Sequence, residues 1–277
     1  MNKIVTCPYC SSSHKPRNTK DASLLACSEC DVVFPKELKN ADQSQAILDD
    51  QYDLVYSTDV SVQWNFASII PELDILHKIA PHIFNNGRSL DIGSGDGTFV
   101  AGLKNKGSNA SGIEAYAVLS KQAQTAGADV RHGRYDTKNL SKEFSDESFE
   151  LISFRECLYY VDSLKETLDL THRRLTDTGI LYIKGNLLDS PYYWSQNNLR
   201  VRYGAMATYM FTYPTLKKIL KKHGFEIIHH IKSPLSFEHF CEALNLPKAP
   251  NIICKMMQIV MRFLPPDRHL IFAQKIK

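Results

Sequence analysis

Four of the seven cysteines lie in two identical pairs near the start of the chain, Cys7 with Cys10 and Cys27 with Cys30. Two residues between the cysteines of a pair let the chain turn so that both sulfurs face one point. Two such turns, separated by residues 11–26, predict a structural zinc site with four thiolate ligands. The segment has too few apolar residues for a core of its own, so the metal would supply folding free energy. The alternatives are a redox dithiol, which belongs in a βαβ context that is absent here, or cysteine pairs that arise by chance. His14 is a possible ligand that the site does not need, because four thiolates already complete it.

A second group of residues suited to chemistry surrounds the apolar run at 90–92. Its members are Asp91 within the run and the turn residues Gly93, Ser94, Gly95 and Gly97 after it. Alternating glycines let the main chain approach a ligand without an intervening side chain. Glu114 ends the next strand-like run, where a carboxylate can accept hydrogen bonds from both hydroxyls of a ribose. The same carboxylate would repel a 2′-phosphate. The alternative for Glu114 is an ordinary surface residue at a strand end.

The elements that position these residues follow from the hydrophobic pattern. From Arg88 onward strand-like runs alternate with helical ones, which indicates βαβ units and a parallel sheet. We expect strands at 89–92, 110–113, 129–131, 149–154, 180–184, 225–229 and 269–275, and helices at 98–106, 117–126, 164–175 and 213–223. Residues 31–85 have helical period instead, and Pro71 marks a break or a helix start.

Composition and charge narrow the class of protein. The chain has 277 residues, 43% hydrophobic and 23% charged, as in ordinary globular proteins. A net charge of +3 disfavours nucleic acid as a partner. The N-terminus lacks the apolar core of a signal peptide, and the apolar stretch at 252–264 is too short and too polar to span a bilayer. We therefore expect a cytoplasmic protein with reduced cysteines, whose residues 252–264 form an amphipathic helix in the fold or at an oligomer contact.

The glycine-rich turn resembles motif I of class I S-adenosylmethionine-dependent methyltransferases. It reads G-x-G-x-G after Leu-Asp-Ile, whereas dinucleotide-binding proteins have G-x-G-x-x-G. Residues 146–152, 175–183 and 216–225 resemble later motifs of the family, although Asp177 and Thr178 replace a proline and a glycine. The resemblance implies an α/β fold, a Rossmann-like seven-stranded methyltransferase sheet with helices on both faces and an added antiparallel strand at the sheet edge. It implies S-adenosylmethionine as the cofactor.

The resemblance also implies cofactor contacts and a domain division. Asp91 is expected near the methionine end of the cofactor, and Gly133, Arg134 and Tyr135 near its adenine. The paired cysteine knuckles are similar to those of a bacterial subgroup whose members modify sugars or secondary metabolites. That subgroup usually has glycine after each second cysteine, where this chain has Ser11 and Asp31. We expect a zinc-ribbon module at 1–40, a helical connector that caps the cofactor site at 41–85, and the Rossmann-like domain at 86–277.

The residues after the fourth strand are expected to face the methyl acceptor, because open parallel sheets bind ligands beyond the carboxyl ends of their strands. Glu156 is the leading candidate for an acceptor-orienting group or base, unless backbone or solvent satisfies its carboxylate. Tyr159 would line the pocket or belong to the core, and His132 is a further candidate base or a plain strand end. Relatives that use magnesium carry Glu-x-x-Glu-His here. This chain has Tyr159 and Tyr160 instead, which predicts metal-independent chemistry.

An aromatic insertion at 186–213 is expected to act as a lid. Its candidate residues either contact a sugar and an anion or only pack: Tyr192, Tyr193, Trp194, Arg200 and Arg202. Tyr52 and Tyr56 resemble aromatics that cap the cofactor. Three functional interpretations remain: a methyltransferase acting on a small molecule or saccharide, an RNA methyltransferase that uses the ribbon to bind RNA, and a non-catalytic cofactor-binding or scaffold protein.

Overall fold

The computed structural model describes residues 5–14, 16–19, 21–53, 64–136, 143–144, 147–189, 207–233 and 268–276. Several predictions fall outside these ranges: those for Tyr56, Tyr192, Tyr193, Trp194, Arg200, Arg202 and the helix at 252–264. Among the described helices, none is long and apolar enough to cross a membrane.

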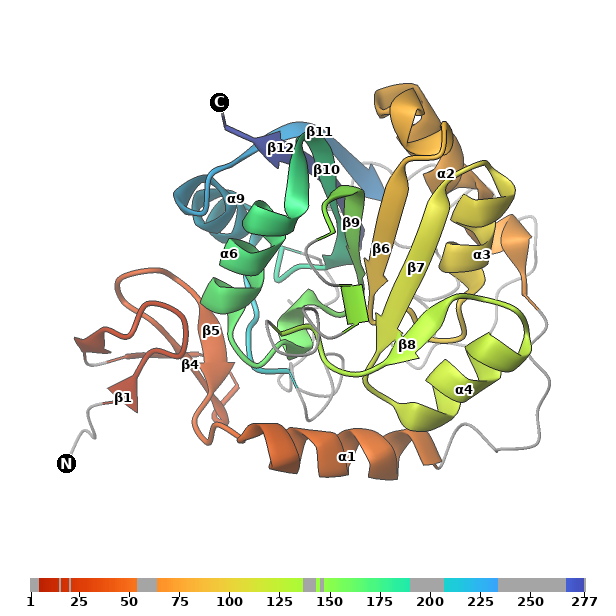
Figure 1. Cartoon of the computed structure of the whole chain (residues 1–277). Helices are drawn as coiled ribbons and strands as arrows, with labels where there is room; N and C mark the ends of the chain where they lie inside the picture. The colour runs from red at the N-terminus through yellow and green to blue at the C-terminus, as the bar shows by residue number, and fades with distance from the viewer. Residues whose placement is uncertain are drawn as a thin grey trace, which may run out of the picture.

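A seven-stranded sheet forms the centre of the molecule, in the order β11-β12-β10-β9-β6-β7-β8 (Figure 1). Its strands are β6 Arg88–Ile92, β7 Asn109–Glu114, β8 Val130–His132, β9 Phe149–Arg155, β10 Leu175–Asn186, β11 Phe225–Ser233 and β12 Arg268–Lys275. Strands β6 to β10 pair in parallel, and β12 pairs antiparallel with both β10 and β11. This is the predicted methyltransferase sheet, but the expected position of the antiparallel strand was wrong: β12 lies between β10 and β11, and β11 forms the edge.

The central strands are buried on both faces, as is usual for parallel strands covered by helices, and their polar residues Ser89, Asp91 and Ser153 are buried with them. Four of the five residues of β6 and five of the seven residues of β9 are buried. β10 starts earlier than the expected residue 180, because Leu175 already pairs with Phe149 before the register shifts between Leu175 and Ile180. Residues 175–179, which the sequence pattern did not assign to the strand, therefore belong to a longer strand that contains an irregularity.

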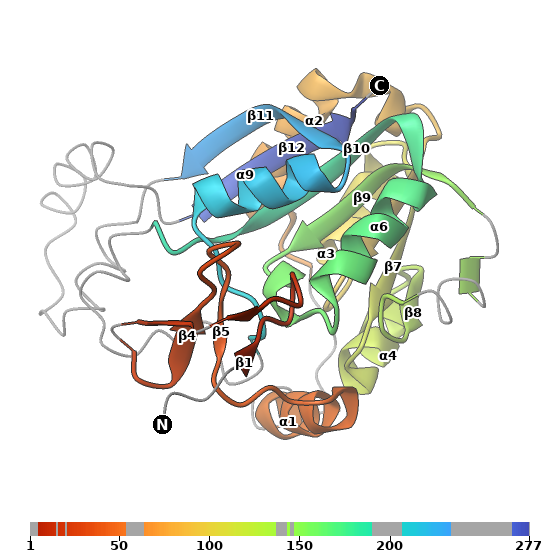
Figure 2. The same cartoon turned by 90° about the vertical axis from the view of Figure 1, so that its left-hand side faces the viewer.

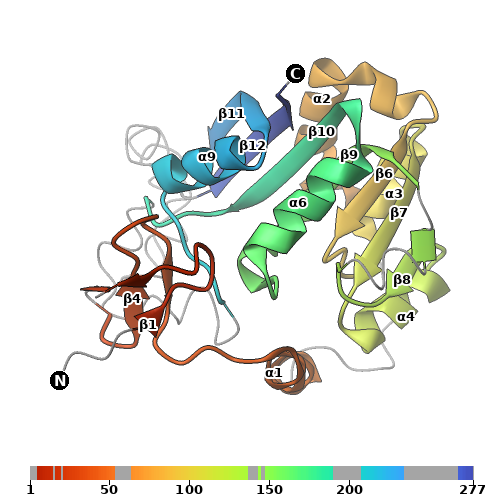
Figure 3. The ribbon, with the colours of Figure 1, turned by 60° about the vertical axis from the view of Figure 1, so that its left-hand side comes forward.

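Helices cover both faces of the sheet (Figure 3). One face carries α2 Ile70–Ile79, α3 Thr98–Asn105 and α4 Ala117–Thr125, and the other carries α6 Leu164–Arg174 and α9 Tyr213–Lys222. Pro71 lies in the first turn of α2, as predicted for a helix start. Short 3₁₀ turns complete this part of the chain: η1 Phe66–Ser68, η2 Pro81–Phe84 and η3 Leu158–Tyr160.

The helices α6 and α9 begin with side-chain caps. Ser163 accepts a hydrogen bond from the backbone N–H of Glu166, and Thr212 accepts one from that of Thr215. Each cap satisfies a backbone donor that the helix itself leaves unpaired. The caps thereby define where the two helices begin.

The N-terminal ribbon consists of two small antiparallel sheets (Figure 2). β1 Val5–Thr6 pairs with β2 Ser13–His14, and β4 Leu24–Ala26 pairs with both β3 Arg17–Asn18 and β5 Val33–Pro35. The ribbon contacts the side of the sheet that carries α6 and α9. After it, α1 Ala41–Asp53 crosses below the carboxyl ends of β6, β7 and β8 (Figure 1).

Candidate functional site

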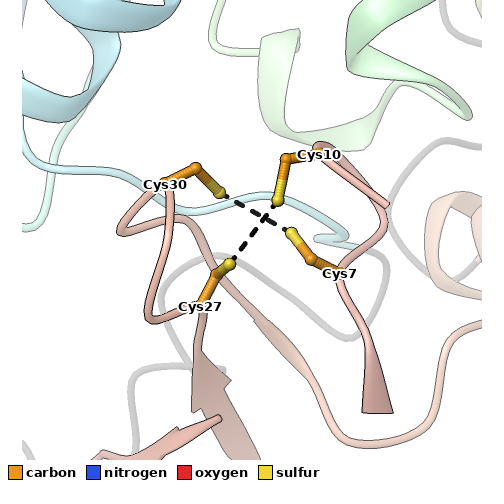
Figure 4. A group of neighbouring side chains, drawn as sticks. All are labelled: Cys7, Cys10, Cys27 and Cys30. Carbon is orange, nitrogen blue, oxygen red and sulfur yellow. Dashed lines mark hydrogen bonds between the residues drawn. The ribbon is translucent and has the colours of Figure 1, made fainter. Parts of the chain in front are cut away.

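The four paired cysteines converge in the ribbon (Figure 4). Sγ of Cys7 lies 3.7 Å from Sγ of Cys30, and Sγ of Cys10 lies 3.6 Å from Sγ of Cys27. All four sulfurs lie within 4.8 Å of one another. Sulfurs bound tetrahedrally at about 2.3 Å from a zinc ion are about 3.8 Å apart, so the cluster has the size and the ligand type of a zinc site.

The backbone after each second cysteine explains how the knuckles form without the glycine that is usual in the similar subgroup. Ser11 has φ 57° and Asp31 has φ 60°, both in the left-handed region. Their N–H groups donate to the carbonyls of Cys7 and Cys27 at 3.0 and 3.2 Å, which closes each turn. Asp31 is well suited to this conformation, since aspartate is enriched there among non-glycine residues. The absence of glycine therefore does not prevent either knuckle from forming.

The electrostatics of the cluster favour a cation. A hydrogen bond from the Cys30 thiol lowers the pKa of Cys7, and the same contact raises the pKa of Cys30. Four thiols so close together cannot all ionise unless positive charge balances them. A divalent ion would remove that conflict and bind all four thiolates, so both the chemistry and the geometry fit zinc.

A cavity of about 430 Å³ opens at the carboxyl ends of the parallel strands, next to α1. Many of the predicted site residues line it: Gly93, Ser94, Gly95, Glu114, Gly133, Arg134, Tyr135 and Glu156. Ser44 and Leu48 of α1 close one side. α1 is fixed there because Gln45 donates to the carbonyl of Ala115 at 3.1 Å and Asp53 accepts a hydrogen bond from Tyr116. The volume is in the usual range for a small-molecule site.

The glycine-rich turn approaches its neighbours too closely for side chains. A Cβ on Gly93 would lie 2.9 Å from Cβ of Cys157, and one on Gly97 would lie 2.7 Å from Cβ of Ala128. Both residues also have positive φ, of 64° and 77°. Glycine is therefore required at both positions, and the turn presents main chain to the cavity.

Glu114 lies under this turn with its carboxylate 7% exposed. Its two oxygens accept hydrogen bonds from the N–H groups of Gly95 and Tyr116, each at 2.8 Å. Burial raises the pKa of this carboxyl, while the two N–H groups act in the opposite direction. A carboxylate offers about four lone-pair positions, so two remain for the hydroxyls of a ribose.

Asp91 lies behind the turn and is only 1% exposed. One of its oxygens accepts a hydrogen bond from Ser153 at 2.6 Å, and the other, Oδ2, has no hydrogen-bond partner. Burial raises the pKa of this carboxyl to about 6, although Arg155 and Ser153 lower it in part. The orphaned Oδ2 and the orphaned hydroxyl of Ser94 are buried polar atoms of the kind that a bound ligand satisfies.

Glu156 begins the loop after β9 and has φ 59°, a strained conformation for glutamate. Its N–H donates to the carbonyl of Lys184 at 2.7 Å, and Oε2 accepts from the hydroxyl of Tyr159 at 2.8 Å. Nε of Arg268 lies 3.3 Å from Oε1, which has no hydrogen-bond partner of its own. A Cβ on Gly185 would lie 3.3 Å from Cε1 of Tyr159, so a side chain at this position would crowd the tyrosine that donates to Glu156.

The sequence of residues 66–230, more than half of the chain, matches the model of the family described as "Methyltransferase domain". The chain belongs to this family. It is an S-adenosylmethionine-dependent methyltransferase of class I, in agreement with the resemblance of its motifs. No curated protein matches its sequence.

Solved structures share the fold of the methyltransferase at low sequence identity. The S-adenosylmethionine-dependent methyltransferase of Archaeoglobus fulgidus is 20% identical with a TM-score of 0.53, and the match covers 74% of this chain and 94% of that one. The S-adenosylmethionine-dependent methyltransferase of Mesorhizobium loti is 18% identical with a TM-score of 0.54, and the match covers 76% of this chain and 100% of that one. The 1,6-didemethyltoxoflavin-N1-methyltransferase of Burkholderia thailandensis, solved with 1,6-didemethyltoxoflavin and S-adenosylhomocysteine, is 17% identical with a TM-score of 0.54, covering 90% and 98%.

The remaining predicted site residues of the methyltransferase lie around the cavity rather than in its wall. Asp91, Gly97, His132 and Tyr159 are not among the lining residues. His132 is exposed, and its Nε2 lies 3.2 Å from the carbonyl of Ala115. Arg134 pairs with Asp162 at 3.4 Å and keeps a buried Nη1 without a hydrogen bond. The roles of these residues remain predictions.

One buried network was missed by the sequence reasoning. Glu72 of α2 accepts hydrogen bonds from Arg155 at 3.0 Å, Lys184 at 2.6 Å and the hydroxyl of Tyr182 at 2.8 Å. Burial opposes ionisation of Glu72, but the two cations outweigh burial and lower its pKa. Arg155 also lines the cavity, so the network fixes one of its walls. An acid after Pro71 in a first helical turn is common, which is why the pattern gave no signal.

Proposed function

We propose that this methyltransferase transfers a methyl group to a small-molecule or saccharide acceptor that Glu156 orients. The carboxylate of Glu156 carries the proposal. It lies in the wall of the cavity, its backbone is strained, and Tyr159 and Arg268 approach its two oxygens from different elements. Backbone strain and side-chain partners that fix a carboxylate are typical of functional residues and are not expected for an ordinary surface glutamate.

S-adenosylmethionine, when bound, supplies a methyl group on a sulfonium that needs no further activation. The turn at Gly93–Gly97 and Glu114 would hold its nucleoside part, and Asp91 and Ser94 offer buried polar atoms beside it. Oε1 of Glu156 is buried and has no hydrogen-bond partner, so a hydroxyl or amine of the acceptor that reaches this oxygen would satisfy it. Arg268 and Tyr159 keep that oxygen in place, so the contribution of the protein is alignment of the acceptor and exclusion of water.

The nature of the acceptor is supported by charge and by analogy. The net charge of +3 supplies little attraction for RNA. The Burkholderia enzyme that shares the fold was solved with a small molecule bound. We further propose that the four cysteines hold a structural zinc ion, since all four ligand positions are filled by the protein and none remains for substrate.

The proposal is tested by incubating the protein with methyl-labelled S-adenosylmethionine and an extract of the source cells. We expect label in small-molecule or glycan fractions that resist RNase. Label that disappears after RNase treatment would establish the RNA interpretation instead. Absence of label, together with no binding of S-adenosylhomocysteine in calorimetry, would favour the non-catalytic interpretation.

The role of Glu156 is tested with Glu156→Gln, which keeps an acceptor for Tyr159 but removes the charge. We expect labelling to fall about a hundredfold while S-adenosylhomocysteine binding stays within about threefold. Glu147→Gln, a change at an exposed glutamate 3.8 Å from Arg88, is the matched control. Equal labelling by both variants would remove Glu156 from the proposal.

A further inference from the structure

The ribbon reaches the acceptor side of the site through a short stretch of main chain, residues 207–212. The N–H of Val33 in β5 donates to the carbonyl of Met210, and the N–H of Met210 donates back to the carbonyl of Val33, both at 2.8 Å. Two residues earlier, the N–H of Thr208 donates to the carbonyl of Tyr159 at 2.9 Å. Residues 207–212 therefore join the ribbon on one side to the loop after β9 on the other.

Side chains make the same connection directly. Leu24 and Val33 of the ribbon belong to one buried apolar cluster with Tyr159, Ala207 and Met210. Leu24 is fully buried and Tyr159 is 6% exposed. Tyr159 thus shares one apolar cluster with two residues of the ribbon, while its hydroxyl donates to Oε2 of Glu156 at 2.8 Å. The packed ring determines where that hydroxyl, and the carboxylate it holds, can lie.

The first cysteine knuckle is fixed to the catalytic domain at a second point. Tyr9, between Cys7 and Cys10, has its hydroxyl 3.2 Å from Nε2 of His223, at the end of α9. Nδ1 of His223 lies 2.6 Å from a carboxylate oxygen of Asp169 in α6. The knuckle thus contacts the catalytic domain at this point, and β5 contacts it at residues 207–212. A change in the folding of the ribbon would therefore alter both contacts.

We propose that the cysteine ribbon is a positioning element of the methyl-transfer site. Leu24 and Val33 fix the position of Tyr159, and the hydroxyl of Tyr159 fixes the carboxylate of Glu156. The geometry of the acceptor side of the site therefore depends on a folded ribbon, and the geometry of the cofactor side does not. The inference rests on the proposed role of Glu156 for its effect on catalysis. The structural link itself can be measured without any acceptor.

Hydrogen exchange followed by mass spectrometry tests the link in the full-length protein. In the wild type, removing the metal with a chelator is expected to speed exchange about tenfold or more in peptides covering 156–160 and 207–212. Peptides covering the turn at 93–97 and the affinity for S-adenosylhomocysteine are expected to change by less than about threefold. Unchanged exchange at 156–160 and 207–212 in the metal-free protein would overturn the proposal.

Two leucine variants separate positioning from general loss of stability. Leu24→Ala removes a ribbon side chain from the apolar cluster that contains Tyr159, and Leu76→Ala removes an equally buried leucine on the opposite face of the sheet. Only Leu24→Ala is expected to speed exchange at 156–160, and Leu24→Met is expected to restore slow exchange. The same pattern in both alanine variants would show that the ribbon contact has no special role.

A double-mutant comparison then connects the link to catalysis. Tyr159→Phe keeps the packing but loses the hydroxyl, so adding Leu24→Ala to it should lower labelling less than Leu24→Ala does alone. Additive effects would mean that Leu24 does not act through the hydroxyl of Tyr159. If Glu156→Gln leaves labelling intact while the exchange pattern holds, the proposed role of Glu156 fails and the structural link stands.

Discussion

Replacing Asp91 by asparagine is expected to stabilise the fold near neutral pH and, at the same time, to weaken binding of the cofactor. The carboxyl is 1% exposed, and burial raises its pKa from 3.8 to about 6. Asparagine keeps an oxygen that can accept the hydrogen bond from Ser153. It differs from the acid mainly in that it never has to ionise in the core.

The size of the effect follows from the two pKa values. Because the folded chain binds the proton more tightly, this group stabilises the fold fully below about pH 4 and loses that contribution as the pH rises through about 6. At about 1.4 kcal/mol per pH unit, the loss by pH 7.5 is about 3 kcal/mol. The asparagine N–H₂ takes the place of the orphaned Oδ2 and costs about 1 kcal/mol if unpaired. The net gain is about 2 kcal/mol at pH 7.5.

Urea denaturation of the wild type and Asp91→Asn at several pH values measures this directly. The difference in the free energy of unfolding should be near zero at pH 4.5 and should rise to about 2 kcal/mol by pH 7.5. Asp74→Asn, at an exposed aspartate that pairs with Lys106 at 3.0 Å, is the control and should change stability by less than about 1 kcal/mol. A difference for Asp91→Asn that does not vary with pH would refute the reasoning, because the carboxyl would then not be costly to ionise.

Two further substitutions test other carboxylates. Glu114→Gln removes a buried charge that accepts two backbone hydrogen bonds, and S-adenosylhomocysteine should bind roughly thirtyfold more weakly in calorimetry, whereas Glu147→Gln should leave the affinity unchanged. Glu72→Gln leaves two buried cations poorly paired and should cost about 3 kcal/mol at pH 7.5, against less than about 1 kcal/mol for Asp74→Asn. Since the pKa of Glu72 is lowered, the loss of stability caused by Glu72→Gln should diminish as the pH falls below about 4. A loss of stability that does not vary with pH would mean that the charge of Glu72 is unimportant.

The parts of the fold and site that could be predicted from sequence are those that depend on neighbours along the chain. The strand at 88–92, the glycine turn and Glu114 lie within 27 residues, and their order alone places the turn beside the acid. The cysteine pairs could be predicted for the same reason, because each knuckle is a local turn. The confirmed elements are those with a strong apolar period and a clear helix start or strand end.

The parts that could not be predicted depend on pairing between distant segments. Arg268 reaches Glu156 only because β12 is inserted beside β10, and Glu72 meets Arg155 only because α2 packs against the sheet. In the sequence around them, neither Arg268 nor Glu72 can be distinguished from an ordinary charged surface residue. The apolar cluster that contains both Leu24 and Tyr159 is of the same kind, since these two residues are 135 positions apart. Local propensity contains no information about such contacts.

The position of β12 has a consequence for how the protein is made. β12 lies between β10 and β11 although it follows both in the chain. During synthesis, β6 to β10 can pair as they leave the ribosome, but β11 has no partner until residue 268 and the residues after it are available. Until then the apolar edge of β10 is an open template for association with other chains. The half of the sheet that binds the methyl donor can thus exist before the half that brings Arg268 to the acceptor, and a stalled nascent chain would be most prone to aggregate in that interval.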